Sequence, residues 1–133
     1  ALVALDKGPQ LCDTYGQPVM DQLHCFVGNQ WKKHYDTPLH QVVCRLTGSI
    51  FVVGSVDTTG PQLAARMQEL YEQMPHECIT TTGMMHRVQF TMSGAAAGLD
   101  EVEAKNWPAL YELCDARLRK VQASGGDRIG CAE

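Results

Sequence analysis

The chain has 133 residues, of which 44% are hydrophobic and 20% are charged. These values are typical of one globular domain with a single core, and they exclude disordered and low-complexity architectures. The formal net charge of −4 argues against duplex DNA or an anionic membrane surface as the main partner, because both are bound through clustered Lys and Arg. No apolar run approaches the about 20 residues of a membrane-spanning helix. The sequence therefore predicts a soluble single domain without a transmembrane segment.

The first half of the chain predicts one helix followed by β structure. Residues 1–17 contain scattered Gly and Pro, which favours an extended, non-helical arm. Apolar residues then recur every three or four positions and predict an amphipathic helix over 18–33. After a break at 36–38, the β-branched segment 42–56 predicts one long strand or two short ones.

In the second half, helices and strands alternate. Helix 61–74 has the clearest apolar stripe, and Thr59 or Gly60 is its expected N-cap. Strict alternation predicts a strand over 86–92 with one buried face, and the small residues at 93–98 favour a loop. The other predicted elements are a short β-prone run at 79–82, a helix over 106–123 and a last strand at 128–131.

From residue 42 onward the predicted order is β, α, β, β, α, β. This order predicts an α+β fold, a ferredoxin-like α/β sandwich with a four-stranded antiparallel sheet and two helices on one face. We expect a single domain over 1–133, in which 1–41 form an N-terminal arm and an extra helix and 42–133 form the split βαβ core.

Six cysteines are spread over the chain without a close pair: Cys12, Cys25, Cys44, Cys78, Cys114 and Cys131. Structural zinc normally needs close ligand pairs, so the spacing disfavours zinc and favours three disulfide bridges of open connectivity. Free thiols remain the alternative. Bridges persist in oxidising compartments, and the start at Ala1 fits removal of a signal peptide or trimming. The cysteines therefore predict a secreted, extracellular protein with a disulfide-stabilised fold.

The catalytic signal is weak. The sequence contains no nucleophile elbow, zinc-protease motif, P-loop or dinucleotide fingerprint, so we predict no catalytic, cofactor-binding or metal-binding residue. The nearest arrangement to a constellation is His34 and His40 around a loop with Tyr35 and Asp36. A His and a carboxylate can serve acid–base chemistry, which leaves a small secreted hydrolase or ribonuclease-like enzyme as the alternative function.

One stretch of the chain resembles a known family. Its markers are Cys44, Ile50-Phe51-Val52-Val53, Thr58-Thr59-Gly60, a helix that leads to Cys78, and the alternating strand 86–92. This pattern is similar to the virally encoded killer toxins of smut fungi and to the related small secreted effectors of plant-pathogenic fungi. The resemblance implies a compact disulfide-bonded α/β sandwich that acts on a host or a competing microbe by binding.

The preferred hypothesis is thus a non-enzymatic secreted fungal effector, with antimicrobial or virulence activity. It implies a host or microbial protein or a cell-surface target as partner, no nucleic acid and no cofactor. A blander possibility is a ferredoxin-like module that forms a homodimer through its open sheet face, so monomer and homodimer both stay open.

Overall fold

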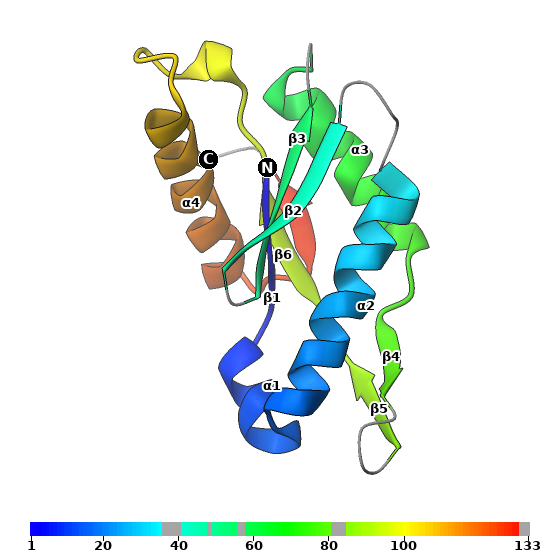
Figure 1. Ribbon diagram of the computed structural model, residues 1–133. Coiled ribbons are helices and arrows are strands. Elements are labelled where there is room, and N and C mark those ends of the chain that lie inside the picture. The colour runs from blue at the N-terminus through cyan, green and yellow to red at the C-terminus, as the bar shows by residue number, and fades with distance from the viewer. Residues whose placement is uncertain (36–40, 48, 56–57, 81–84, 131–133) are drawn as a thin grey trace.

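The computed structural model describes residues 1–35, 41–47, 49–55, 58–80 and 85–130. A twisted sheet runs through the middle of the molecule, with helices on both sides of it (Figure 1). The helices are α1 (Gly8–Tyr15), α2 (Gln17–Tyr35), α3 (Gly60–Gln73), the 3-10 helix η1 (Leu99–Glu101) and α4 (Trp107–Ala123). The strands are β1 (Leu2–Leu5), β2 (Gln41–Thr47), β3 (Ile50–Ser55), β4 (Glu77–Thr80), β5 (His86–Gln89), β6 (Met92–Ala95) and β7 (Arg128–Gly130).

The main sheet has five strands in the order β2-β3-β1-β6-β7. Strand β1 lies in the centre, antiparallel to β3 on one side and to β6 on the other. At the far edge β7 runs parallel to β6, so the sheet is mixed. Strands β4 and β5 form a separate antiparallel ribbon. The α+β class is therefore correct, whereas the four-stranded antiparallel sheet with helices on one face is not observed.

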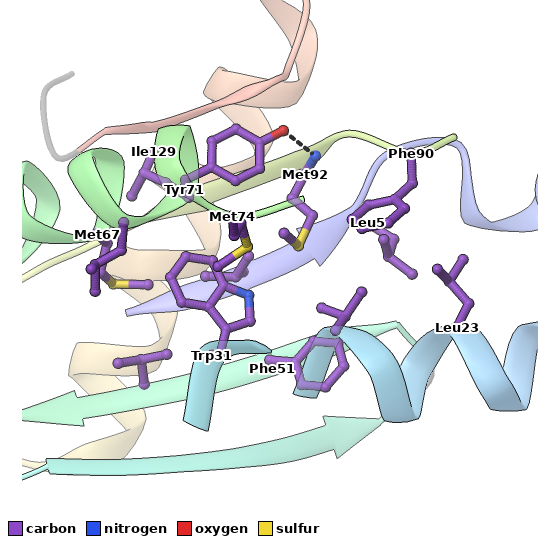
Figure 2. Close-up of a cluster of buried hydrophobic side chains, with 14 of the residues drawn as sticks. Leu5, Leu23, Trp31, Phe51, Met67, Tyr71, Met74, Phe90, Met92 and Ile129 are labelled. Atoms are coloured by element: carbon purple, nitrogen blue, oxygen red, sulfur yellow. Dashed lines mark hydrogen bonds between the residues drawn. The ribbon is translucent and has the colours of Figure 1, made fainter. Parts of the chain in front are cut away.

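Both faces of the sheet are covered. Helices α2 and α3 pack on one face, where Trp31, Met67, Tyr71 and Met92 belong to one buried cluster (Figure 2). Helix α4 covers the other face, and its Cys114 and Leu118 contact apolar side chains of β1 and β6. A strand covered on both faces is apolar at every position, and all four residues of β1 are buried.

The capping residues explain where two of the helices begin. Thr59 caps α3, because its hydroxyl accepts from the N–H of Gln62 while the Gln62 side chain accepts from the N–H of Thr59. Asn106 caps α4 by accepting from the N–H of Ala109. These helices and α2 confirm the amphipathic patterns of the sequence.

Three expected segments are corrected. The non-helical arm at 1–17 contains the central strand and α1. The expected strand at 86–92 is divided between the ribbon and the main sheet, and the expected loop at 93–98 supplies most of β6. Small residues occupy β6 because space is short there: a Cβ atom on Gly94 would lie 2.5 Å from Cδ1 of Ile129.

The expected disulfides are absent among the described cysteines. All five of these thiols are free: Cys12, Cys25, Cys44, Cys78 and Cys114. Cys131 lies outside the described residues. Two of the thiols are buried in the core, where they pack against apolar side chains and form no disulfide bond. Among the described helices, none is long and apolar enough to cross a membrane.

Candidate functional site

The candidate site lies beneath the turn that joins β2 to β3, where two hollows meet at His24. The α2 hollow, of about 360 Å³, is lined by His24, Cys25, Gly28, Asn29, Lys32, Val43, Cys44, Arg45 and Phe51. The α1 hollow, of about 430 Å³, is lined by Ala4, Leu5, Gly8, Pro9, Cys12, Gln17, Met20, His24, Arg45, Ser49, Ile50 and Gln122. His24 and Arg45 belong to both linings, so the two hollows are neighbours.

His24 connects α2 to the β2–β3 turn. Its side chain is buried, and its Nε2 lies 2.7 Å from Oγ of Ser49. Its Nδ1 is also buried and has no hydrogen-bond partner among the described residues. A buried N–H without an acceptor costs more than a buried ring nitrogen without a donor, which favours the tautomer with the proton on Nε2. In this tautomer His24 donates to Ser49, and the Ser49 hydroxyl is left to donate into the α1 hollow.

The described charged side chains that line the two hollows are all positive. Neither is lined by an Asp or a Glu among the described residues, whereas Arg45 and Lys32 supply positive charge. Burial and the nearby Arg45 guanidinium lower the pKa of His24, and Asp21 opposes that shift. The free imidazole is therefore neutral near pH 7.

The start of α1 adds a further donor surface. Gly8 is the first residue of this eight-residue helix, and its position lines the α1 hollow. A Cβ atom there would lie 3.3 Å from Oγ of Ser49, so glycine lets the helix start approach the turn closely. Unpaired backbone N–H groups at a helix N-terminus favour anions. Pro9, the next residue of α1, has no N–H, so Gly8 is the helix-start residue of this lining that can donate from its backbone, beside the Arg45 guanidinium and the Ser49 hydroxyl.

A third hollow, of about 520 Å³, has the opposite character. It is lined by Asp6, Lys7, Leu11, His76, Glu77, Gln89, Phe90 and Thr91, so two carboxylates face it. The Asp6 carboxylate accepts hydrogen bonds from the hydroxyls of Thr91 and Ser93 and from the N–H of Asp127. These bonds join the end of β1 to β6 and to the turn before β7, so Asp6 has a structural role.

The structure places only some of the residues that the sequence analysis singled out. The side chains of His34 and Tyr35, and all of residues 36–40, lie outside the described residues, so the proposed catalytic constellation is not placed. Three of the expected disulfide cysteines, Cys12, Cys25 and Cys44, line the two hollows instead.

Sequence reasoning missed His24. The available signal was its position on the buried side of α2, four residues after the buried Met20 and beside the buried Leu23. A polar side chain on an apolar helix stripe either finds a partner in the core or lines a cavity. His24 does both.

Comparison with known proteins identifies the fold. No protein-family model matches the sequence, and no curated protein matches it. Solved structures do match. The GGDEF domain of YfiN (TpbB) from Pseudomonas aeruginosa has a TM-score of 0.81 at 16% identity, over 99% of this chain and 80% of that one. The GGDEF domain of DgcB from Caulobacter crescentus, in complex with c-di-GMP, has a TM-score of 0.74 at 16% identity, over 96% and 73%. The active GGEEF domain of a diguanylate cyclase from Vibrio cholerae has a TM-score of 0.69 at 16% identity, over 98% and 78%.

The chain has the fold of a GGDEF domain. This finding contradicts the resemblance to killer toxins and fungal effectors, and with it the effector function. The expectation of a non-enzymatic protein is also wrong, because proteins with this fold include an active diguanylate cyclase. The expected host or microbial target is also corrected, because the proteins that share the fold have other partners: the DgcB structure is a complex with c-di-GMP, and that of the diguanylate cyclase SiaD is a complex with its activator SiaC. The extracellular location stays a prediction.

The names of these domains spell a five-residue sequence that this chain lacks. Neither Gly-Gly-Asp-Glu-Phe nor Gly-Gly-Glu-Glu-Phe occurs in it. Of the segments that end in one of its three Phe residues at the fifth position, 47–51 (Thr-Gly-Ser-Ile-Phe) has Gly second. This segment joins β2 to β3. With Phe51 set against the final Phe of the names, Ser49 and Ile50 fall at the two acidic positions. Gly125-Gly126-Asp127 matches the first three letters but is followed by Arg128 and Ile129.

The donor set of the site bears on metal binding. Transfer of nucleotide phosphates generally uses Mg²⁺, which binds carboxylate oxygens. The linings of the two hollows contain no described Asp or Glu. Over the described ranges, no group of three or more His, Cys, Asp or Glu side chains is suited to a metal ion. The residues present do not fit a protein-held Mg²⁺, and no metal-dependent step follows from them.

Proposed function

We propose that this protein binds a guanine nucleotide through its phosphates at the joined α1 and α2 hollows, as part of diguanylate signalling. The observation that carries the proposal is a hollow with a positive lining and without carboxylates, in a fold shared with a domain that binds c-di-GMP. The competing hollow beside Asp6 is lined by the carboxylates of Asp6 and Glu77 as well as by Lys7, so its lining is less positive than that of the joined hollows.

Each part of the lining has a chemical task in this proposal. The Arg45 guanidinium can hold two phosphate oxygens at once, and the Ser49 hydroxyl can donate to a third. The backbone at Gly8 faces the same phosphate with the positive end of α1. The amide of Asn29, in the α2 hollow, can both donate to and accept from the edge of a purine base.

Calorimetric titration with GTP and with c-di-GMP tests the proposal, and ATP serves as the comparison for base recognition. We expect binding of a guanine nucleotide, and the two ligands distinguish a nucleotide triphosphate from a cyclic dinucleotide. Arg45→Ala should weaken binding by about tenfold, the usual size for a charge-assisted contact. The control is Lys33→Ala, an exposed cation outside both linings, which should change the affinity by less than about twofold. Absence of guanine-nucleotide binding, or equal effects of the two variants, would overturn the proposal.

A further inference from the structure

The inference concerns how the negative charge of a bound phosphate is compensated at a site without carboxylates. Most nucleotide sites bring in Mg²⁺, which is held by one or two carboxylates together with the phosphates. Here the described lining offers a guanidinium, a hydroxyl, a helix N-terminus and a buried imidazole. We propose that Arg45 and a proton taken up by His24 neutralise the phosphate at this site, in place of a divalent cation. The inference rests on the proposed function, because it assigns the charge balance of that same site.

The position of His24 is the first argument. The ring lines both hollows, its Nε2 is 2.7 Å from Oγ of Ser49, and its Nδ1 is buried without a partner among the described residues. A buried polar atom without a partner is uncommon in folded proteins and calls for an explanation. A proton on Nδ1 supplies that explanation once an anion lies nearby, because the imidazolium then donates from both nitrogens.

The charges around His24 are the second argument. The charged groups that act on the pKa of His24 are Arg45 from β2 and, one helical turn earlier on α2, Asp21. Lys32 and the thiols of Cys25 and Cys44 line the α2 hollow together with His24. Helix α1 contributes the Cys12 thiol to the same hollow, and β1 and β3 contribute apolar side chains. Burial and Arg45 keep the pKa of the free imidazole below its ordinary value. A phosphate between Arg45 and His24 reverses the balance, since it screens the guanidinium and favours the charged ring.

Linkage fixes the sign of the pH effect. If the pKa of His24 is higher in the complex than in the free protein, binding takes up a proton from the solvent. Affinity then rises as the pH falls from about 8 toward 6, by at most about tenfold per pH unit for one proton. A carboxylate-held Mg²⁺ predicts no such rise, because carboxylates with a pKa of about 4 stay ionised between pH 8 and 6.

The first experiment is a calorimetric titration of the wild-type protein with GTP, with excess MgCl₂ and with EDTA. We expect dissociation constants that agree within about threefold, less than 1 kcal/mol. Titrations in two buffers of different ionisation enthalpy measure the protons exchanged, and uptake of part of one proton per GTP at pH 7 is the expected result. Strict dependence on Mg²⁺, or no proton uptake, would overturn this inference while leaving the guanine-nucleotide function in place. Failure of GTP and c-di-GMP to bind at all would overturn both.

The second experiment assigns the proton to His24. His24→Gln keeps a side-chain N–H for Ser49 but cannot gain a proton, so GTP binding should persist at pH 8 and lose its rise at pH 6. His86→Gln, on β5 and in neither lining, is the control and should keep the pH dependence. If the His24 variant does not fold, the ring protons of His24 in the wild-type protein can be followed by NMR. Their titration midpoint must move to higher pH when GTP is added, and an unchanged midpoint contradicts the assignment.

Discussion

Two polar regions of this molecule, one around Asp6 and one around His24, differ in how completely their polar groups are hydrogen-bonded. Around Asp6, three donors from distant parts of the chain converge on one carboxylate. The cluster continues through Asp127, which accepts from the hydroxyl of Tyr71. Burial and this bond raise the pKa of Tyr71, which therefore stays protonated. The Tyr71 oxygen in turn accepts from the N–H of Met92 (Figure 2).

The region around His24 is different in each respect. The charged side chains that line its hollows are Arg45 and Lys32, and the Asp21 carboxylate also acts on the ring. A buried ring nitrogen has no partner among the described residues, and the hydroxyl of Ser49 faces a hollow. A fully hydrogen-bonded network contributes to stability, whereas polar groups that line a hollow can bind a ligand. The Asp6 cluster therefore holds the fold together, whereas His24 and Ser49 line a hollow in which a ligand can bind.

The largest effect is expected from Asp6→Ala. Removing the carboxylate leaves two hydroxyls and one backbone N–H without their acceptor, and we expect the free energy of unfolding to fall by about 3 kcal/mol. Urea denaturation measures it. GTP affinity of the folded fraction should stay unchanged, and a selective loss of binding with normal stability would contradict the division of roles.

Gly126→Ala should break the same cluster by sterics. Gly126 has a φ of +70°, and a Cβ atom there would lie 2.8 Å from Oδ2 of Asp6 and 2.7 Å from Oγ of Ser93. We expect a loss of about 2 kcal/mol in urea denaturation. The matched control is Gly125→Ala, which shares a positive φ but meets no atom within 4 Å. It should cost about 1 kcal/mol, the conformational part alone. Equal losses would show that crowding against Asp6 is unimportant.

Ser49→Asp adds a carboxylate to the α1 hollow, which then resembles the region around Asp6. The new charge repels phosphate, and we expect GTP affinity in EDTA to fall by about tenfold. Part of the loss should return with MgCl₂, since the variant then offers a carboxylate oxygen to the cation. Ser49→Asn, similar in size but neutral, is the control. An unchanged affinity in Ser49→Asp would place the phosphate elsewhere.

The smallest effect concerns acid stability. Glu101 accepts from Arg117, with Oε1 and Nη2 2.7 Å apart, and also from the N–H of Gly98. The bonds from Arg117 hold the pKa of Glu101 below its ordinary value. The ionised Glu101 carboxylate therefore contributes its full stabilisation of the folded state above the unfolded-state pKa, about 4.3. This stabilisation is lost as the pH falls through the lowered folded-state pKa. Glu101→Gln should therefore lower Tm near neutral pH and reduce the further loss of Tm on acidification, as followed by circular dichroism. If Tm falls equally steeply with decreasing pH in the variant, the acid-induced loss of stability comes from other carboxylates.

Local patterns predicted the amphipathic helices and their caps, because an apolar stripe and a capping side chain are properties of neighbouring residues. The central strand was beyond that reasoning. Leu2–Leu5 is short and wholly apolar, and its identity depends on partners at 50–52 and 92–95. The small residues of β6 have the sequence pattern of a loop, although close contacts such as that of Gly94 with Ile129 require them in the strand.

The candidate site was hidden for the same reason. Arg45, His24 and Gly8 are far apart in the sequence and form no recognisable spacing, so only the packing of α2 against β2 brings them together. The cysteines misled the prediction. Their even number suggested bridges, whereas the described thiols serve as core residues and as lining residues of the hollows.

The central position of β1 has a consequence for folding kinetics. Because β1 pairs with β3 and β6, the sheet stays in two parts until segments about 50 and 90 residues downstream have met the first strand. Such distant pairings close large loops before contacts reward them, which slows folding. On the ribosome, the β2–β3 hairpin and α3 emerge before β6 is synthesised. One edge of β1 therefore has no partner strand until β6 emerges.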